Sequence, residues 1–533
     1  MTTALPAGAM QPYALTLDRF ITHAAKWHGA TEVVTGGSGG ASTRIGYAAL
    51  RERSQRLSGA FRSLGLMPGD NLGVLAWNSQ AHMECWYGAM GIGIVCHTLN
   101  PRLADDHLAG MIRQAANRVL AISPDLTALA GRLVALCPSL EHVVVLDEPG
   151  AEMPPTRYGS VRSWRYEELL AERGEAMAWG GFDENLPAGL CFTSGTTGAP
   201  KGVTYTHRSN YLHTIHQVQT DASGLSALDS LLVAVPMFHA NGWGFPFSGP
   251  AVGAKLVLPS RHQDGASLAR LINAEGVTVA AGVPTVWLGL VDHLDRTGEE
   301  VPSLRRIMLG GSSVPQGLMD RLEARLGVTI QTSWGMTELS PLGTTTPATS
   351  PVRSAAKSGR PPIGVDLLLT DADGVPLAEQ RGREGRLRVR GASVVERYFG
   401  HDAPAVDADG WFDTGDLAVI DDKGNVSITG RAKDLIKSGG EWINPGEIEA
   451  IVGALPEVAQ VAVVGRAHAK WGERPILIIE PCKGADISDE TLLAVLRARV
   501  ASWWLPDAIV RVAAMPLALT GKIDKTRLRA EHG

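Results

Sequence analysis

Apolar residues in the N-terminal half of the chain follow two alternating spacings. Helical spacing connects the apolar residues from Leu50 to Leu64 and ends at Gly65, and a Pro-Gly-Asp turn then leads into an apolar stretch at 71–77. The same alternation predicts strands at 94–99, 119–123 and 143–147, with helices at 80–90 and 105–116. Strands that alternate with helices in this way predict parallel βα units whose helices cover the sheet.

The pattern changes after the middle of the chain. Strands are still expected at 230–235, 255–258, 277–282, 306–309 and 329–333. A Thr-, Ser-, Ala- and Pro-rich stretch at 344–360 follows and is expected to be a mobile connector. Strands at 382–390, 411–420 and 424–428, with hairpin turns at Asp373-Gly374 and Lys423-Gly424, then predict a small antiparallel barrel.

The C-terminal stretch returns to alternating strands and helices, with Ser488 as the N-cap of one helix. At 533 residues the chain exceeds what one core usually supports, so more than one domain is expected. The predicted fold class is α/β: a large N-terminal domain of α/β layers plus a small β-barrel, followed by a small α+β C-terminal domain.

Composition excludes several classes of partner. The net charge is −6 and no basic tract occurs, which argues against nucleic acid. Five cysteines, odd in number and spread through apolar runs, indicate reduced thiols rather than a disulfide framework. No run reaches the roughly 18 apolar residues that span a bilayer, and the start of the chain has no secretory pattern. We therefore expect a soluble cytoplasmic protein with no membrane span.

The most informative stretch is Thr-Ser-Gly-Thr-Thr-Gly-Ala-Pro-Lys-Gly at 193–202. An apolar strand at 189–192 precedes it and a helix is expected at 208–219, so the loop is predicted to join a strand to a helix. Glycines let backbone N–H groups approach an oxyanion, while hydroxyls and a lysine neutralise its charge. The spacing is not that of Walker A, which argues against a P-loop kinase or a G protein.

Two later strands also end in chemically useful residues. Gly311 and Ser312 follow one strand, and the sequence Trp-Gly-Met-Thr-Glu at 334–338 follows the next. Ligands collect at the carboxyl ends of strands in open α/β sheets. Trp334 offers a flat face for a base, Thr337 a hydroxyl for phosphate, and Glu338 an oxygen for Mg²⁺.

Together these blocks resemble the adenylate-forming (ANL) superfamily of acyl-CoA synthetases, luciferases and peptide-synthetase adenylation domains. The loop at 193–202 is similar to its signature, and the block at 334–338 resembles its Tyr-Gly-x-Thr-Glu motif with Trp for Tyr. The block at 430–449 resembles the hinge motif, and Pro-x-x-x-x-Gly-Lys at 516–522 resembles the terminal motif. The resemblance covers essentially the whole chain and is greatest to medium-chain and methylmercaptopropionate-type acyl-CoA ligases.

The resemblance implies a role for each matching residue. It implies that ATP is bound by Thr193, Ser194, Gly195, Thr196, Thr197, Gly198, Lys201, Gly311, Ser312, Trp334, Gly335, Met336, Asp416, Ile428 and Arg431. It implies that His239, Thr337, Glu338 and Lys522 act in adenylation, with Glu338 also holding Mg²⁺. It implies that Lys437, Gly439, Gly440, Glu441 and Trp442 serve the transfer to CoA. The acyl pocket would include Trp243, Gly310 and Pro341.

The implied reaction has two steps, and the small domain would present a different face to the substrate in each. A carboxylic acid, medium-chain or aromatic, attacks ATP to give an acyl-adenylate and pyrophosphate, and CoA then takes the acyl group. By resemblance, residues 1–431 form the adenylation domain and residues 432–533 a mobile domain that turns about Lys433. An amide synthetase that delivers the acyl group to an amino acid or amine would keep the same motifs and stays as the alternative. A homodimer is one option for the subunit arrangement.

Two positions depart from the superfamily pattern. Trp334 replaces the usual tyrosine, which keeps a stacking face and loses a hydroxyl. Asp524 stands where relatives usually carry an apolar residue, which puts the local packing in question.

Overall fold

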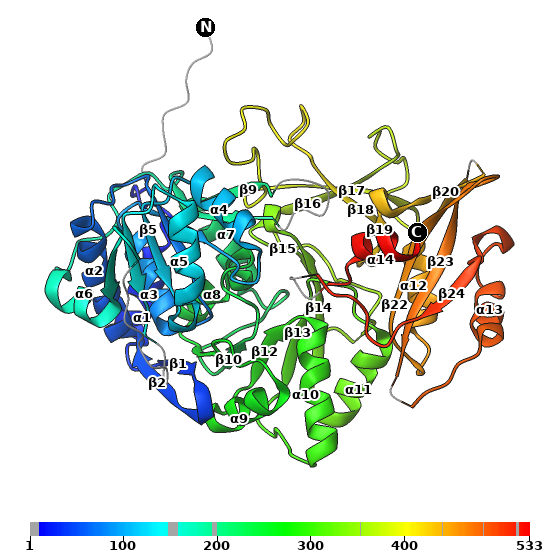
Figure 1. Ribbon diagram of the computed structural model, residues 1–533, viewed down its shortest axis with the longest axis horizontal. Helices are drawn as coiled ribbons and strands as arrows, with labels where there is room; N and C mark the ends of the chain where they lie inside the picture. The colour runs from blue at the N-terminus through cyan, green and yellow to red at the C-terminus, as the bar shows by residue number, and fades with distance from the viewer. Residues whose placement is uncertain are drawn as a thin grey trace, which may run out of the picture.

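The computed structural model describes residues 10–147, 158–193, 200–351, 353–439, 441–482, 484–518 and 522–533. Two large sheets lie at the centre of the N-terminal part, and the C-terminal elements, orange to red in Figure 1, gather at one side of it. Within the described ranges, no helix is both long enough and apolar enough to cross a bilayer. The α/β architecture with a large N-terminal and a small C-terminal domain confirms the predicted fold class.

The first large sheet is built around parallel strands, as the apolar pattern predicts. Its order is β7 (Arg162–Arg165), β6 (His142–Val145), β5 (Val119–Ile122), β3 (Asn71–Leu75), β4 (Val95–Thr98), β8 (Pro187–Phe192) and β9 (Gly202–Thr206). All neighbouring pairs are parallel except β8 and β9, which form an antiparallel hairpin at the edge.

The second large sheet is also mainly parallel. Its order is β15 (Leu342–Thr345), β14 (Thr329–Gly335), β13 (Arg306–Leu309), β12 (Val279–Gly282), β10 (Ser230–Val233), β11 (Lys255–Leu258), β1 (Glu32–Gly36) and β2 (Ser42–Gly46). Antiparallel strands close both edges, β15 beside β14 and β2 beside β1.

Helices pack on these sheets. They are α1 (Asp18–Trp27), α2 (Tyr47–Ser63), α3 (Gln80–Met90), α4 (Asp105–Gln114), α5 (Thr127–Leu136), α6 (Tyr166–Arg173), α7 (His207–Gln217), α8 (Phe245–Val252), α9 (Gly265–Glu275), α10 (Pro284–Thr297) and α11 (Gln316–Leu326). The sequence pattern predicted α3 to the residue but did not predict α5, α6, α8, α9, α10 or α11.

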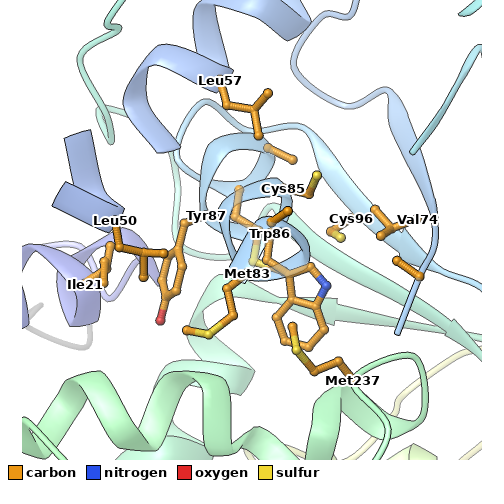
Figure 2. Packing of buried hydrophobic residues seen from close by; sticks show 14 of the residues in the cluster. Ile21, Leu50, Leu57, Val74, Met83, Cys85, Trp86, Tyr87, Cys96 and Met237 are labelled. Carbon is orange, nitrogen blue, oxygen red and sulfur yellow. The ribbon is translucent and has the colours of Figure 1, made fainter. Parts of the chain in front are cut away.

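Helix α3 joins the two sheets into one core. Every residue from Ala81 to Met90 is buried, which is typical of a helix surrounded by protein rather than one at the surface. The Trp86 ring packs 5.4 Å from that of Phe247, and Figure 2 shows Met237 beside the same indole. The core cluster around α3 includes Val74 of the first sheet and residues of β10 in the second, so the two sheets are held in fixed relation.

The predicted junction after the glycine-rich loop is wrong in one respect. The loop does not lead directly into a helix, because β9 lies between the loop and α7. Helix α7 itself begins at His207, one residue before its predicted start. The described strands on either side of the loop, β8 and β9, pair antiparallel with each other. The short β9 was missed because Gly202–Thr206 mixes polar and apolar residues too briefly to show a period.

The predicted antiparallel barrel region takes the form of a four-stranded antiparallel sheet. Its order is β16 (Val365–Thr370), β17 (Glu384–Gly391), β18 (Phe412–Ile420) and β19 (Val426–Arg431). The stretch before it differs from the mobile connector that composition predicted. Its first residues complete β15, and Thr344, Thr345 and Thr346 are buried there, with Thr332 hydrogen-bonded to Thr346.

The C-terminal domain is a sheet flanked by short helices. Its strands follow the order β21 (Glu441–Ile443), β20 (Ile436–Ser438), β23 (Gly472–Pro481) and β22 (Val458–His468), and β24 (Ala508–Arg511) pairs with β23. The helices are α12 (Pro445–Gly453), α13 (Asp489–Arg497) and α14 (Lys525–His532). Ser488 caps α13, as predicted, by accepting a hydrogen bond from the Thr491 N–H.

The unusual Asp524 has a local explanation. Its carboxylate accepts the backbone N–H of Arg527 at 3.0 Å and so caps the N-terminus of α14. An apolar residue at this position could not make that bond. The aspartate therefore begins the last helix of the chain and does not disturb its packing.

Candidate functional site

The predicted site residues of the large domain lie where strands of the two sheets end. His239 follows β10, Gly310 follows β13, Glu338 follows β14 and Thr193 follows β8. Because β10, β13 and β14 belong to the parallel part of the second sheet, their carboxyl ends present His239, Gly310 and Glu338 at one edge of that sheet. Thr193 lies at the carboxyl end of β8, in the parallel part of the first sheet.

Glu338 is positioned by hydrogen bonds to its carboxylate, to its backbone carbonyl and to the carbonyl of the preceding residue. Its side chain is buried, and Oε1 accepts a hydrogen bond from the Tyr398 hydroxyl at 3.0 Å. The Glu338 carbonyl accepts the Val395 N–H at 2.8 Å, and the neighbouring Thr337 carbonyl accepts the Tyr205 hydroxyl at 2.8 Å. Burial raises the pKa of the Glu338 carboxyl above its ordinary value, while the Tyr398 hydrogen bond opposes that rise.

A single carboxylate in this position fits Mg²⁺. Magnesium is usually bound by one or two carboxylates together with substrate phosphates and water. Among the described residues no cluster of three His, Cys, Asp or Glu side chains could hold a metal by itself. Among the described residues, Tyr398 donates to one oxygen of Glu338, and the charges of Lys201 and Arg431 also act on this carboxylate. The carboxylate is therefore suited to share a cation with a nucleotide.

Lys201 and Tyr398 connect this carboxylate to the glycine-rich loop. The Lys201 ammonium lies 4.7 Å from the centroid of the Tyr398 ring, and the Phe399 N–H donates to the Gly202 carbonyl at 2.8 Å. At the start of the loop, the Thr193 N–H donates to the Lys201 carbonyl at 2.9 Å and closes it. Ser194, Gly195, Thr196, Thr197 and Gly198 lie outside the described residues.

Asp416 is bonded through both of its carboxylate oxygens. It stands directly opposite Arg431 across β18 and β19, and Arg431 Nε lies 2.6 Å from Oδ1. The indole N–H of Trp334 donates to Oδ2 at 2.8 Å. Asp416 is 2% exposed, and this burial raises its pKa, while Arg431 and Trp334 act in the opposite direction.

Lys522 reaches this group from the small domain. Its ammonium is close enough to Asp416 and Glu338 for both carboxylates to act on it, and its own charge acts on His239. The residue as a whole keeps an exposed surface, but the surrounding protein removes water from the ammonium and so lowers its pKa, and the nearby Arg431 charge adds to that lowering. In Figure 1 the red segment before α14 extends from the small domain towards β14. The last motif of the sequence thus meets residues of the large domain.

His239 is a half-buried, uncharged imidazole. Burial, together with the nearby Lys522 charge, lowers its pKa to about 4, so the ring is neutral at pH 7. The strand that leads to it is fixed by Asn78, whose amide donates to the carbonyls of Val233 and Val235 at 2.8 and 2.7 Å. The Asn78 carbonyl oxygen also accepts the Met237 N–H at 2.7 Å. One buried amide thereby sets the direction of the chain just before His239.

The turn after His239 is left-handed rather than helical. Ala240, Asn241 and Trp243 have φ values of 43°, 54° and 54°, and the two glycines among them are also positive. L-residues avoid this region, so the surroundings must hold the turn in place. The Gln217 amide does so by donating to the Trp243 carbonyl at 2.7 Å. Trp243 follows His239 by four residues, a spacing that in the sequence alone predicts one helical turn between them, and this prediction is wrong.

This turn brings Trp243 against Gly310 and Gly311. A Cβ at Gly310 would stand 2.4 Å from Ser333 Oγ and 3.3 Å from the Trp243 ring, and one at Gly311 would stand 3.4 Å from the same ring. Two positions without side chains thus face a half-buried indole. Pro341 is buried nearby, where its carbonyl accepts the Met336 N–H at 3.1 Å.

The remaining predicted nucleotide residues lie around these groups. Gly335 and Met336 follow Trp334 in half-buried positions, and Ser312 is half-buried after β13. Ile428 lies on β19 and packs against the core of the four-stranded sheet.

The residues assigned to the second step lie elsewhere, on the small domain. Lys437 is exposed on β20, with its ammonium 5.4 Å from the centroid of Trp442, which is 53% exposed. Gly439 has a φ of 61°, and a Cβ there would stand 2.8 Å from the Trp471 ring. Glu441 is exposed as well, and Gly440 lies outside the described residues. The described members of this group are not brought to Glu338 and Asp416.

Lys433 stands between the two groups, in the short turn at 432–434 that follows β19. Burial lowers the pKa of its ammonium, and the neighbouring Asp434 opposes that shift. On the other side of this turn, Asp434 is joined to α14 by Arg529, whose guanidinium donates to its carboxylate at 2.7 Å.

Sequence reasoning missed three residues that shape the site: Asn78, Tyr205 and Tyr398. None belongs to a motif, and each acts through contacts with residues far away in the chain. Tyr398 is 60 positions from its partner Glu338, and Asn78 is 159 from Met237. No local pattern could have identified them.

Comparison with known proteins gives consistent results across the whole chain. The family model described as "AMP-binding enzyme" matches residues 20–399, and that of the "AMP-binding enzyme C-terminal domain" matches residues 447–522. The 3-methylmercaptopropionyl-CoA ligase of Ruegeria lacuscaerulensis is 39% identical over 98% of both chains. The medium-chain-fatty-acid–CoA ligase of Ectopseudomonas oleovorans is also 39% identical, over 99% of this chain and 97% of its own.

Solved structures have the same fold. The ATP-bound MatB of Rhodopseudomonas palustris is 25% identical, with a TM-score of 0.84 over 97% of this chain and 99% of its own. An anthranilate CoA ligase in complex with anthranoyl-AMP has a TM-score of 0.87 at 22% identity, over 98% of both chains.

Proposed function

Since the chain belongs to the AMP-binding enzyme family and is an AMP-forming acyl-CoA ligase that uses ATP, we propose that its substrate is a medium-sized apolar or aromatic carboxylic acid. We also propose how its residues divide the two half-reactions. The acid is first activated as an acyl-adenylate, and CoA then takes the acyl group. The amide synthetase alternative has no support among the relatives named above, which are CoA ligases.

In the first half-reaction a carboxylate oxygen of the acid forms a bond to the α-phosphorus of ATP, and the bond to pyrophosphate breaks. A carboxylate needs no general base, so the protein has to neutralise charge and hold the reactants in line. Lys522 supplies a cation beside Asp416 and Glu338, and neutral His239 can donate a hydrogen bond without repelling Lys522. Mg²⁺, held by Glu338 when bound, would neutralise charge on the departing phosphates.

The placement of Lys522 is the observation that carries this proposal. A lysine near a C-terminus is usually solvated and alone, whereas Lys522 lies near two carboxylates and a histidine of the other domain. Asp416 and Arg431 would bind the ribose, and Trp334 would face the adenine. Thr193, Lys201 and the intervening loop residues would surround the outer phosphates.

For the second half-reaction we propose that residues 432–533 rotate about Lys433 as a mobile domain separate from residues 1–431. The rotation would withdraw Lys522 and bring Lys437, Gly439 and Trp442 to the adenylate. Exposed Lys437 and Trp442, at present turned to solvent, support this role. The proposed role of Gly439 is to leave room for the thiol of CoA, and its position has no space for a side chain, since a Cβ there would stand 2.8 Å from the Trp471 ring.

The close approach of Trp243 to two glycines supports a substrate of intermediate size. Trp243 closes against Gly310 and Gly311, so a flat or flexible acyl chain meets an indole wall and two positions without side chains. The named relatives act on 3-methylmercaptopropionate and medium-chain fatty acids, which fit this range. One methylene changes specificity by only about 1–3 kcal/mol, so the exact acid needs a direct measurement.

A cytoplasmic location and a homodimer complete the proposal. All five cysteines are free thiols, which supports a reducing compartment. Exposed apolar side chains such as Trp27, Leu228 and Ile363 are available to a second subunit. Sedimentation of the purified protein distinguishes a dimer from a monomer.

The test is mass spectrometry of the products from a panel of carboxylic acids. Each acid is supplied with Mg-ATP, CoA and a mixture of amino acids in the same reaction. We expect acyl-CoA and AMP as products. The turnover should be greatest for acids of intermediate chain length or acids with a single aromatic ring. Greatest turnover with acetate or with acids beyond about C16 would contradict the proposed pocket.

A further inference from the structure

Trp334 and Asp416 come from different sheets and meet through one hydrogen bond. Trp334 lies on β14 of the second large sheet, and Asp416 lies on β18 of the four-stranded sheet, 82 positions later. The indole N–H donates to Oδ2 at 2.8 Å, while Arg431 lies at Oδ1 from the neighbouring strand. Each oxygen of one buried carboxylate therefore has its own donor.

We propose that Trp334 is a positioning residue for ribose recognition: its indole N–H orients the Asp416 carboxylate so that the free lone pairs of that carboxylate face the ribose hydroxyls of ATP. This inference rests on the proposed role of Asp416 as the ribose-binding carboxylate. It assigns Trp334 a function beyond a stacking face for adenine.

Hydrogen-bonding capacity supports this assignment. An ionised carboxylate has about four lone-pair directions, and Trp334 and Arg431 occupy two of them. Two remain, which matches the two hydroxyls of a ribose. Arg431 alone would let the carboxylate turn about its last side-chain bond, whereas a second donor on the other oxygen fixes the plane. An indole N–H donates only, so it cannot compete with the carboxylate for the ribose protons.

Packing alone does not require this hydrogen bond. Trp86 and Trp287 are more deeply buried than Trp334, yet their indole nitrogens have no hydrogen-bond partner within the described part of the chain. The fold thus tolerates buried tryptophans whose N–H is unpaired. The N–H of Trp334 instead meets a buried carboxylate, and the close approach of Gly343 to the ring keeps it there, since a Cβ on Gly343 would stand 2.3 Å from the ring.

The test compares ATP with 3′-deoxy-ATP in wild type, Trp334→Phe and Asp416→Asn. For each protein, kcat/KM is measured with both nucleotides by pyrophosphate release, and the value for ATP is divided by the value for 3′-deoxy-ATP to give the ratio. Losing the indole donor leaves a flat ring but frees the carboxylate, so Trp334→Phe should lower the ratio about ten-fold, the usual effect of one hydrogen bond to a charged group. Asp416→Asn should lower it at least as far. Trp86→Phe, which removes an unpaired indole N–H, should leave the ratio at its wild-type value.

The outcomes separate the inference from the proposed function. If Asp416→Asn lowers the ratio and Trp334→Phe does not, the positioning role is wrong and the ribose role of Asp416 stands. If Asp416→Asn leaves the ratio unchanged, the ribose role itself fails. A loss of adenine stacking alone would reduce kcat/KM for both nucleotides equally and leave the ratio unchanged, which also contradicts the inference.

A second variant covers the case in which Trp334→Phe does not fold. Replacement of Trp334 by 3-benzothienylalanine exchanges the N–H for sulfur and keeps the two-ring shape, so core packing is conserved. The same ten-fold fall in the ratio is expected. An unchanged ratio in this folded variant would overturn the inference.

Discussion

Lys522 and Lys437 belong to the same small domain but differ in every contact. Lys522 lies near Asp416, Glu338 and His239 of the large domain, whereas Lys437 stands exposed over Trp442, with its backbone N–H bonded to Glu473. In this arrangement of the two domains, Lys522 and not Lys437 lies near these groups of the large domain. The difference supports a mechanism in which each half-reaction uses its own face of the small domain.

The largest effect is expected from replacing Lys522, which tests directly whether the two lysines serve different half-reactions. Lys522→Ala removes the cation next to the reacting groups, so acid-dependent pyrophosphate release should fall about 10²–10³-fold. Transfer from a synthetic acyl-adenylate to CoA should stay close to wild type, because that step is assigned to the other face. Unchanged pyrophosphate release would show that Lys522 has no part in adenylation.

Lys437→Ala should give the opposite result with a smaller effect. We expect transfer from the synthetic adenylate to fall about ten-fold, the range of one charge-assisted contact, while pyrophosphate release changes little. Lys26→Ala is the matched control, since Lys26 also lies over an exposed tryptophan, at 4.8 Å, but on α1 of the large domain. Equal losses in the two half-reactions for Lys437→Ala would contradict the division between faces.

The smallest effect is expected from removing the helix caps of the small domain. Comparing two caps tests whether the surroundings of Lys522 matter for adenylation. Asp524→Ala and Ser488→Ala each remove an N-cap, at α14 and α13, and each should lower the free energy of unfolding by about 0.5–2 kcal/mol. Asp524 is two positions from Lys522, so only its loss should also slow pyrophosphate release, by a few-fold. Denaturant unfolding and the pyrophosphate assay measure both effects, and equal activity of the two variants would separate the α14 cap from adenylation.

Several elements could be predicted from sequence alone because their signals are local. Helix α3 and the strands β11 and β13 have the predicted bounds, and the Ser488 cap is observed as expected. The parallel βα alternation and the antiparallel region after it also agree with the apolar pattern. In each case the deciding contacts lie within a few residues, where periodicity and capping rules apply.

The errors concern places where distant contacts override local preference. The left-handed turn at Trp243 depends on Gln217, and the buried threonines of β15 depend on pairing with β14, although their composition is typical of a connector. Strand β9 forms because β8 is available to pair with it. These partners are distant in the chain, so the local sequence pattern cannot predict them.

The sequence by itself determined the chemistry available to this protein: a glycine-rich loop with a lysine, a carboxylate after a strand, and two lysines near the C-terminus. These features depend only on residue type and on the order of residues within short motifs, so they can be identified in the sequence. The tertiary structure alone decided which of them meet. It brought Lys522 rather than Lys437 to Glu338 and Asp416, and it placed the Trp334 N–H on one oxygen of Asp416 and Arg431 on the other. These contacts join strands of separate sheets and domains, and only the packed chain brings such strands together.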